Sequence, residues 1–257
     1  MKDPNEYNVR AVERALQILG CFDDKYPERG ISEIAQAVGL HKATAHRIVT
    51  TLVNYGYLER AEDGQKYRLG LELTNLGYKV ISRMDLRREA HPFMKQLVQE
   101  WDETCDLSIF DQGKVFYIEV FRGNRALNIA AAVGQRLPAH STASGKLFLA
   151  HLPPGESDIL LSQPLTAYTE KTIISPDLLR KQFKIIRDQG FAVDIGEFEE
   201  GVCAISAPIY NRKGKVIAAI GGPSPISRMT EERIAGMAEA YKAAGQAISR
   251  RIGYDPS

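Results

Sequence analysis

The chain has 257 residues, of which 44% are hydrophobic and 25% charged, and its formal net charge is +1. This is an ordinary globular composition, with enough length for one large domain or two small ones. No stretch approaches the roughly 20 apolar residues of a membrane span, and the polar N-terminus lacks the apolar core of a secretory signal. The three widely spaced cysteines (Cys21, Cys105 and Cys203) argue against a disulfide framework or a zinc finger. We therefore expect a reducing, cytoplasmic location.

Two helices are expected at the start of the chain, because apolar side chains recur there at helical spacing. The first covers residues 9–22, and its expected apolar face consists of Val12, Ala15, Leu16 and Leu19. The second begins near Ser32, a residue type suited to capping a helix. Gly39 then supplies the residue that a sharp turn between helices tolerates best.

A third helix is expected over residues 42–54, with Gly56 just past its end. Its expected apolar face consists of Ala45, Ile48, Val49 and Leu52. Two short strands follow, at 57–60 and 66–69, and the Asp63-Gly64 pair between them is a strong hairpin signal. The order helix, turn, helix and hairpin indicates a winged helix-turn-helix, which places one helix in the major groove of DNA.

The side of the third helix opposite its apolar face carries no acidic residue. Arg47 could bind a guanine bidentately, Ala43 could meet a thymine methyl, and the hydroxyl and ammonium groups suit phosphate oxygens. The residues expected to contact DNA are Lys42, Ala43, Thr44, His46, Arg47, Thr50 and Thr51, with Lys66 and Arg68 from the hairpin. Two alternatives remain open, a solvated helix face and a winged helix that binds protein. Ten basic and ten acidic residues within 1–70 count mildly against nucleic-acid binding.

The remainder of the chain begins with a helical pattern over residues 71–85, interpreted as a linker helix, and a second one over 86–103. Strands are then expected at 107–110, 115–121, 127–133, 191–195, 202–210 and 215–221. Helices are expected at 144–151, at 156–162, from Pro176 onward, and at 231–252 with Thr230 as the cap. Hairpin-linked strands with helices between the groups predict an α+β domain with a largely antiparallel sheet. The expected organisation is a winged helix-turn-helix domain at 1–70, a linker helix at 71–85 and an effector-binding domain at 86–257.

Short motifs recur in a fixed order along both parts of the chain. In the first part they are VERAL (12–16) with Leu19, Ile34-Ala35, Gly39-Leu40, KATAHR (42–47), GYL (56–58) and YRLG (67–70). In the second part they are GQRLPAH (134–140), SGK (144–146), GFA (190–192), EGVCAISAPI (200–209) and GPSPISR (222–228). With these motifs the chain resembles the IclR family of bacterial transcription regulators over nearly its whole length.

The resemblance implies a winged helix-turn-helix, a linker helix and a C-terminal effector-binding domain related to GAF-type sensors. Family members pair through their DNA-binding domains and often form tetramers. They act as repressors, activators or both, often beside genes for the catabolism of small organic or aromatic acids. The resemblance therefore implies a homodimer or homotetramer that binds double-stranded DNA at a pseudo-palindromic operator.

The resemblance also implies an effector pocket in the C-terminal domain. Ala143 and Ser144 match positions whose backbone N–H groups meet a ligand carboxylate, at the start of an expected helix where the dipole favours an anion. Cys203 matches a pocket-lining position, and Glu197 lies in a loop where the family often has an acidic residue. Each has a simpler interpretation: Cys203 as a small buried hydrophobe, Ser144 as a helix cap.

Gly221 and Pro223 match two positions at which some family members carry serines that hydrogen-bond the ligand. Glycine offers only its backbone and proline lacks an N–H. The chain therefore departs from those members, and the loss of side chains enlarges the pocket so that it could admit a bulkier or more apolar acid.

An enzyme is the weaker alternative. The tripeptide Ser144-Gly145-Lys146 matches the end of a phosphate-binding loop, but His140 stands where that motif requires glycine. The acidic residues near Asp194 could do acid–base work, yet no partner nucleophile or cofactor loop accompanies them. We therefore expect no enzyme activity, cofactor or metal. The sequence predicts a cytoplasmic, sequence-specific regulator whose operator affinity depends on a small organic acid.

Overall fold

The computed structural model describes residues 9–23, 25–62, 64–82, 85–125 and 129–255, with the side chains of 78–85 and 154 left out. The chain divides into two compact units, Met1–Arg83 and Met84–Ser257. The two units are described separately.

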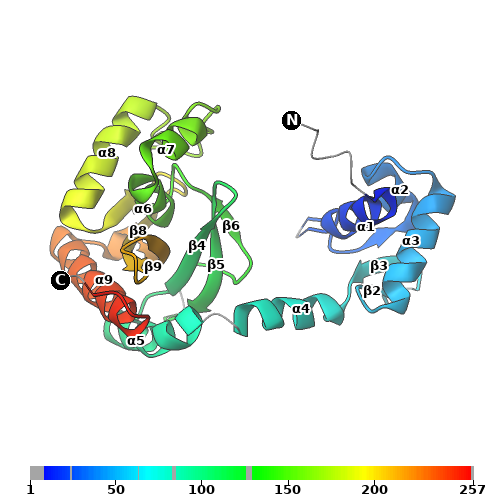
Figure 1. Ribbon diagram of the computed structural model, residues 1–257, viewed down its shortest axis with the longest axis horizontal. Helices are drawn as coiled ribbons and strands as arrows, with labels where there is room; N and C mark the ends of the chain where they lie inside the picture. The colour runs from blue at the N-terminus through cyan, green and yellow to red at the C-terminus, as the bar shows by residue number, and fades with distance from the viewer. Residues whose placement is uncertain (1–8, 24, 63, 83–84, 126–128, 256–257) are drawn as a thin grey trace. The chain divides into compact units, whose positions relative to one another are not determined.

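The first unit begins with the helices α1 (Arg10–Gly20), α2 (Ile31–Ala37) and α3 (Lys42–Asn54). They are followed by a hairpin of β2 (Leu58–Arg60) and β3 (Lys66–Leu69), to which the short β1 (Arg29–Gly30) adds a third antiparallel strand in the order β1-β3-β2. The helix α4 (Leu71–Ser82) then ends the unit (Figure 1). This order of elements is a winged helix-turn-helix, as the sequence predicted.

Two details of these helices differ from the sequence prediction. In α1 the buried residue is Ile18, whereas Val12 and Leu16 are 56% and 64% exposed. Ala15 and Leu19 of the predicted face do pack against the core, so spacing alone found part of the buried face and missed Ile18. In α2 the N-cap is Gly30 rather than Ser32, and the carboxylate of Glu33 accepts a hydrogen bond from the Gly30 N–H at 2.7 Å.

The second unit is a six-stranded antiparallel sheet in the order β6-β5-β4-β9-β8-β7. Its strands are β4 (Cys105–Asp111), β5 (Lys114–Phe121), β6 (Arg136–Pro138), β7 (Ala192–Ile195), β8 (Val202–Tyr210) and β9 (Val216–Pro225). The helices α5 (Asp85–Trp101) and α9 (Glu231–Arg251) pack on one face, with a 3-10 turn (Ile226–Arg228) before α9. The helices α6 (Ala143–His151), α7 (Pro154–Leu161) and α8 (Pro176–Gln189) pack on the other (Figure 1). The α+β class with an antiparallel sheet is confirmed.

The strand expected at 127–133 is wrong for its described part, and residues 126–128 lie outside the described ones. Residues 129–133 form a loop, and the edge strand is β6, which pairs Leu137 with Val115. Side chains form hydrogen bonds to backbone groups of this loop: Gln135 accepts from the Ala132 N–H, and Arg122 donates to the Ala131 carbonyl. A short apolar run cannot reveal this arrangement by its periodicity.

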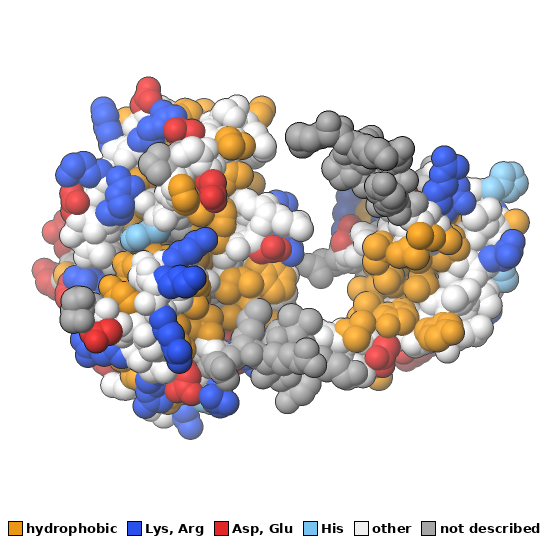
Figure 2. All heavy atoms as spheres, in the orientation of Figure 1, with side chains coloured by type: hydrophobic (Ala, Val, Ile, Leu, Met, Phe, Trp, Pro, Cys, Tyr) orange, Lys and Arg blue, Asp and Glu red, His pale blue; other side chains and the backbone are white. Residues whose placement is uncertain are grey.

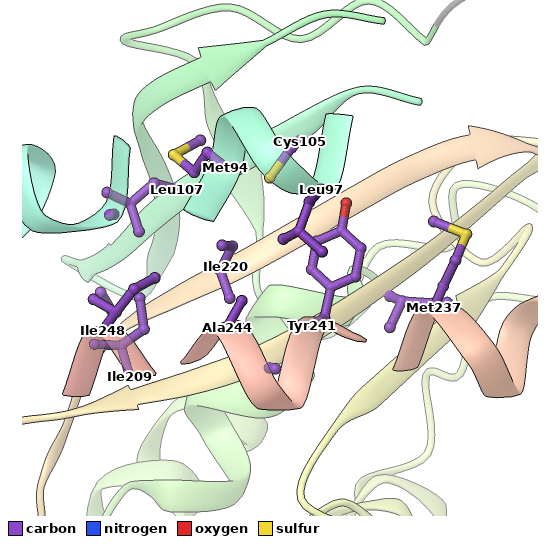
Figure 3. Close-up of a cluster of buried hydrophobic side chains, with 14 of the residues drawn as sticks. Met94, Leu97, Cys105, Leu107, Ile209, Ile220, Met237, Tyr241, Ala244 and Ile248 are labelled. Atoms are coloured by element: carbon purple, nitrogen blue, oxygen red, sulfur yellow. The ribbon is translucent and has the colours of Figure 1, made fainter. Parts of the chain in front are cut away.

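The core between the sheet and the α5–α9 pair is continuous and fully buried. Met94 and Leu97 of α5 meet Ile220 of β9 and Tyr241 of α9 (Figure 3). A Cβ placed on Gly222 would lie 2.1 Å from the Tyr241 hydroxyl oxygen, so this strand position admits only glycine.

On the opposite face of the sheet, α6 is buried at every position from Ala143 to Ala150. Its N-cap is Thr142, whose hydroxyl accepts from the Gly145 N–H at 3.2 Å and donates to the Pro138 carbonyl at 2.8 Å. A Cβ on Gly145 would lie 2.2 Å from the Ala139 carbonyl oxygen. The start of α6 is therefore held against the segment that follows β6.

Candidate DNA-binding surface and ligand cavity

The third helix presents its polar side to solvent. Ala45, Val49 and Leu52 are buried and Ile48 is partly buried, as predicted. The predicted contact residues that are exposed are Lys42, Ala43, His46, Arg47, Thr50 and Thr51, and Thr44 is half-buried. Figure 2 shows Lys, Arg and His side chains over α3. The helix therefore offers a cationic, acid-free surface.

The two threonines of this surface do not offer free hydroxyl protons. Thr50 donates to the His46 carbonyl at 2.8 Å and Thr51 to the Arg47 carbonyl at 3.0 Å, one helical turn back. Their oxygens remain acceptors, which do not suit a phosphate. The structure thus places Thr50 and Thr51 at the surface without the donor geometry expected of them.

The hairpin residues Arg68 and Lys66 differ in their surroundings. The Arg68 guanidinium forms an ion pair with Glu59 at 2.6 Å and lies 3.9 Å from the Glu28 carboxylate. Its charge is therefore offset within the unit. Lys66 is exposed.

Two cations that the sequence interpretation did not select lie on the same surface as α3. Arg10 and Arg14 of α1 line a broad hollow, of about 1200 Å³ including open solvent, together with Thr44, His46 and Arg47. From its sequence, α1 was predicted only as a helix with an apolar face. Arg10 and Arg14 therefore make the surface around α3 more positively charged than the predicted contact residues alone would.

The second unit contains a cavity at the N-terminus of α6, with about 570 Å³ of empty space that is partly open to solvent. Its polar walls come from Asp106 of β4, Tyr117 of β5, Asp194 of β7 and the first turn of α6. Apolar walls come from residues before β6 and from β8 and β9. The shape is that of a small-molecule site, with several polar groups converging in a mostly apolar pocket.

Three of the predicted effector residues, Ala143, Ser144 and Pro223, line this cavity. Cys203 does not, because its side chain lies in the core on the other face of the sheet. Strand neighbours point to opposite faces, and Ala204 lines the cavity instead.

Gly221 and Glu197 lie just outside the cavity lining. A Cβ on Gly221 would be 3.0 Å from both carboxylate oxygens of Asp106 and 3.2 Å from the Ser144 hydroxyl, so it forms part of the floor beneath them. Glu197 forms an ion pair with Lys146, whose side chain is fully buried. The Lys146 ammonium also donates to the Val193 carbonyl at 2.9 Å. This lysine of the SGK motif therefore holds the loop after β7 against α6.

Two buried carboxyl groups, those of Asp106 and Asp194, line the cavity, and the exposed Glu199 lies at its border. Burial raises the pKa of Asp106 to about 7, and its Oδ1 atom is buried without a hydrogen-bond partner among the described residues. Burial also raises the pKa of Asp194 to about 7. The hydrogen bond that its Oδ1 accepts from the Glu197 N–H at 2.7 Å acts in the opposite direction and lowers this pKa, but by less than burial raises it. Both groups are therefore poised to change protonation near neutral pH.

Beside Asp106, two serines form a buried contact. The Ser144 hydroxyl donates to the Ser206 hydroxyl at 2.9 Å, and Ser206 lies opposite Gly221 in the sheet. Neither Asp106 nor Ser206 was selected from the sequence, since only the strand pairing brings β4 and β8 beside the start of α6.

Within the described part of the chain, no group of three or more His, Cys, Asp or Glu side chains could hold a metal ion. Among those same residues, no helix combines the length and apolar character that crossing a membrane requires.

The chain belongs to the IclR family. The model of the IclR helix-turn-helix domain matches residues 11–62, and that of the bacterial transcriptional regulator IclR C-terminal region matches residues 78–250. Family members are DNA-binding transcription regulators with a C-terminal effector-binding domain, and so is this protein, which is not expected to be an enzyme.

Similar proteins agree over almost the full length. The chain is 35% identical to the HTH-type transcriptional regulator XynR of Escherichia coli K12, covering 96% of this chain and 98% of XynR. It is 32% identical to KipR of Bacillus subtilis, covering 95% and 98%. A transcriptional regulator from Rhodococcus sp. RHA1 has a similar structure, with TM-score 0.86, 29% identity and coverage of 95% and 98%. An IclR homologue from Microbacterium hydrocarbonoxydans, crystallised with 4-hydroxybenzoate, gives TM-score 0.85, 29% identity and coverage of 94% and 98%.

Proposed function

We propose that this regulator reads a pseudo-palindromic operator with two copies of α3, and that a small organic acid in the cavity of the second unit controls its affinity for DNA. The observation that carries the DNA-binding part is the exposed, acid-free face of α3 with Lys42 and Arg47, extended by Arg10 and Arg14 of α1. Arginine can bind guanine bidentately, while lysine and the α1 arginines suit phosphates. The half-sites would lie about 34–36 Å apart, one turn of DNA.

Pairing of two chains has its own support in the first unit. Val9, Val12 and Leu16 of the α1 region are each more than half exposed, and Figure 2 shows hydrophobic side chains gathered over α1. A contiguous exposed apolar patch on a protein surface commonly marks an interaction site. We assign it to a second copy of this chain, as dimeric operator binding requires. The proposed location is the cytoplasm. Binding to DNA places the protein inside the cell, and three free cysteines suit a reducing compartment.

The effector part of the proposal is supported by the first turn of α6. A helix N-terminus attracts anions through its free N–H groups and its dipole, and Ala143 and Ser144 line the cavity at that point. The Microbacterium homologue binds an aromatic acid. Operator DNA and effector must change each other's affinity by the same factor.

The test is a binding-site selection from random duplex DNA with the parent protein and the Arg47→Ala variant. The parent should enrich a pseudo-palindrome, and the variant should lose its preference at one position of each half-site, by about 1–3 kcal/mol per contact. Arg250→Ala is the matched control, because Arg250 is an exposed arginine of the second unit. If Arg47→Ala enriched the same sites as the control, α3 would not be the reading helix.

A further inference from the structure

We infer that Asp106 is a specificity-determining residue of the cavity, and that it selects organic acids that carry a hydroxyl group over matched acids without one. This rests on the proposed function, since it takes the cavity to be an organic-acid site.

The cavity offers two opposite kinds of binding group side by side. At the start of α6, the N–H groups of Ala143 and Ser144 have no acceptor within the helix, as in the first turn of any helix. They line the cavity and suit a carboxylate. These N–H groups alone would be enough to bind a simple anion.

The carboxyl group of Asp106 is the second binding group. The residue is 2% exposed, lines the cavity, and has one oxygen without a hydrogen-bond partner among the described residues. An unsatisfied buried acceptor is costly, and a ligand that donates to it removes that cost. The free oxygen therefore calls for a hydrogen-bond donor on the ligand.

The neighbours of Asp106 do not supply that donor. The Ser144 hydroxyl above it is directed to Ser206, and Gly221 beneath it has no side chain. Across the cavity, Asp194 is a second buried acid, Tyr117 is a buried phenol, and the exposed Glu199 is a third acid at its border. Among the described residues that line the cavity, none is a lysine, arginine or histidine.

A hydroxyl group fits this environment better than an ammonium or an apolar group. Burial holds the pKa of both acids near 7, so either carboxyl is partly protonated at neutral pH. A hydroxyl both donates and accepts and so bonds to either form, whereas an ammonium only donates and pairs strongly only with the charged form. An apolar group leaves the Asp106 oxygen unpaired. The departure to Gly221 and Pro223 therefore does not make this site one for an apolar acid.

The experiment is calorimetric titration of the full-length protein with matched acids at pH 7. The pairs are gluconate with hexanoate and 4-hydroxybenzoate with benzoate, and 6-aminohexanoate represents an amine. The parent should bind the hydroxylated member of at least one pair tenfold or more tightly than its partner, because a site built for a hydroxyl rejects the analogue that lacks it.

Three variants test the residue. Asp106→Leu should abolish or reverse the preference, since it removes the acceptor. A charged carboxylate is the stronger acceptor, so the parent's preference should increase between pH 6 and 8. Asp106→Asn keeps the shape, and its preference should vary less over this range, because Asp194 is then the remaining buried acid of the cavity that titrates there. Asp111→Asn changes a half-buried acid at the end of the same strand, outside the cavity, where it pairs with Arg136 at 2.6 Å, and should bind like the parent. Thermal melts identify any variant that does not fold. If Asp106→Leu does not fold, the result for Asp106→Asn decides whether Asp106 sets the preference for a hydroxyl group.

Two outcomes would overturn the inference. In one, the parent binds hydroxyl-free acids or 6-aminohexanoate as tightly as the hydroxy acids. In the other, the parent's preference and its pH dependence persist undiminished in the Asp106 variants. Either outcome would overturn the role of Asp106 but would still agree with the proposal that the cavity binds an organic acid. If no acid of the panel binds, the effector part of the proposed function fails, and the inference fails with it.

Discussion

Lys146 and Glu197 form an ion pair inside the second unit, joining the buried helix α6 to the loop after β7. The Lys146 side chain is fully buried and that of Glu197 is 12% exposed. The same loop carries Phe198 and Glu199, which line the cavity. The pair therefore connects the helix that starts at the cavity with the loop that borders it.

Replacing Lys146 with methionine should destabilise the protein by about 3–5 kcal/mol, because a buried carboxylate loses its partner. Urea unfolding followed by circular dichroism measures the change. Lys184→Met is the control, since Lys184 pairs with Asp188 at the surface and should contribute less than about 0.5 kcal/mol. Equal destabilisation by the two substitutions would contradict the structural role given to Lys146.

Asp106 should make stability fall as pH rises. Its pKa is about 7 in the folded chain, against 3.8 ordinarily, so the native state holds the proton more tightly than the unfolded state. Its contribution is full below pH 4 and is lost by about pH 7. Asp106→Asn should therefore be more stable than the parent at pH 8, by up to about 4 kcal/mol, and similar to it at pH 4. Urea unfolding of both proteins at each pH checks this, and a constant difference would refute it.

Filling the cavity should abolish effector binding without loss of the DNA-binding surface. Ser144→Trp places a large side chain at the start of α6, where Ser144 lines the cavity. Calorimetry with an acid that the parent binds should show no heat of binding, while gel shifts still detect operator binding. Ser162→Trp, at an exposed position after α7, is the control. Undiminished acid binding by Ser144→Trp would place the site elsewhere.

Lys42 should contribute to DNA binding through charge alone. Lys42→Ala should weaken binding to every sequence and lower the slope of log K against log salt by about 0.9, the value for one phosphate contact. Fluorescence anisotropy at several salt concentrations measures the slope. Lys213→Ala removes an exposed lysine from a turn of the second unit and should leave the slope unchanged. A slope unaffected by Lys42→Ala would remove Lys42 from the interface.

The exposed residues of α1 should hold two chains together. Leu16→Glu places a charge in the apolar patch, where Leu16 is 64% exposed, and should shift the protein toward smaller assemblies in sedimentation velocity runs. Ile159→Glu makes the same change on α7, where Ile159 is 65% exposed. If only Ile159→Glu reduced the assembly, the pairing surface would lie on the second unit.

The winged helix-turn-helix was predictable because its signals are local. The spacing of Ala45, Val49 and Leu52 fixes which side of α3 is buried, and a hairpin is encoded by a dipeptide. The predicted face of α1 was right in part: Ala15 and Leu19 pack against the core, but Ile18 is buried in place of Val12 and Leu16, which only the packing decides.

The cavity was less accessible to sequence reasoning. Ala143 and Ser144 could be found because they begin a helix. Cys203 could not be told from Ala204, since a shift of one residue turns a strand side chain to the other face. Asp106 becomes noticeable only when pairing of β4 with β9 places it opposite Gly221 and beneath Ser144.

The contact between Gly145 and the Ala139 carbonyl bears on how this protein tolerates change. A side chain at 145 would push the first turn of α6 away from the segment that precedes it. In a saturation library screened for operator binding, position 145 should therefore accept no other amino acid, although its neighbour Ser144 should accept several. The site would thus be free to diversify in what it recognises, while the backbone that presents it stays fixed.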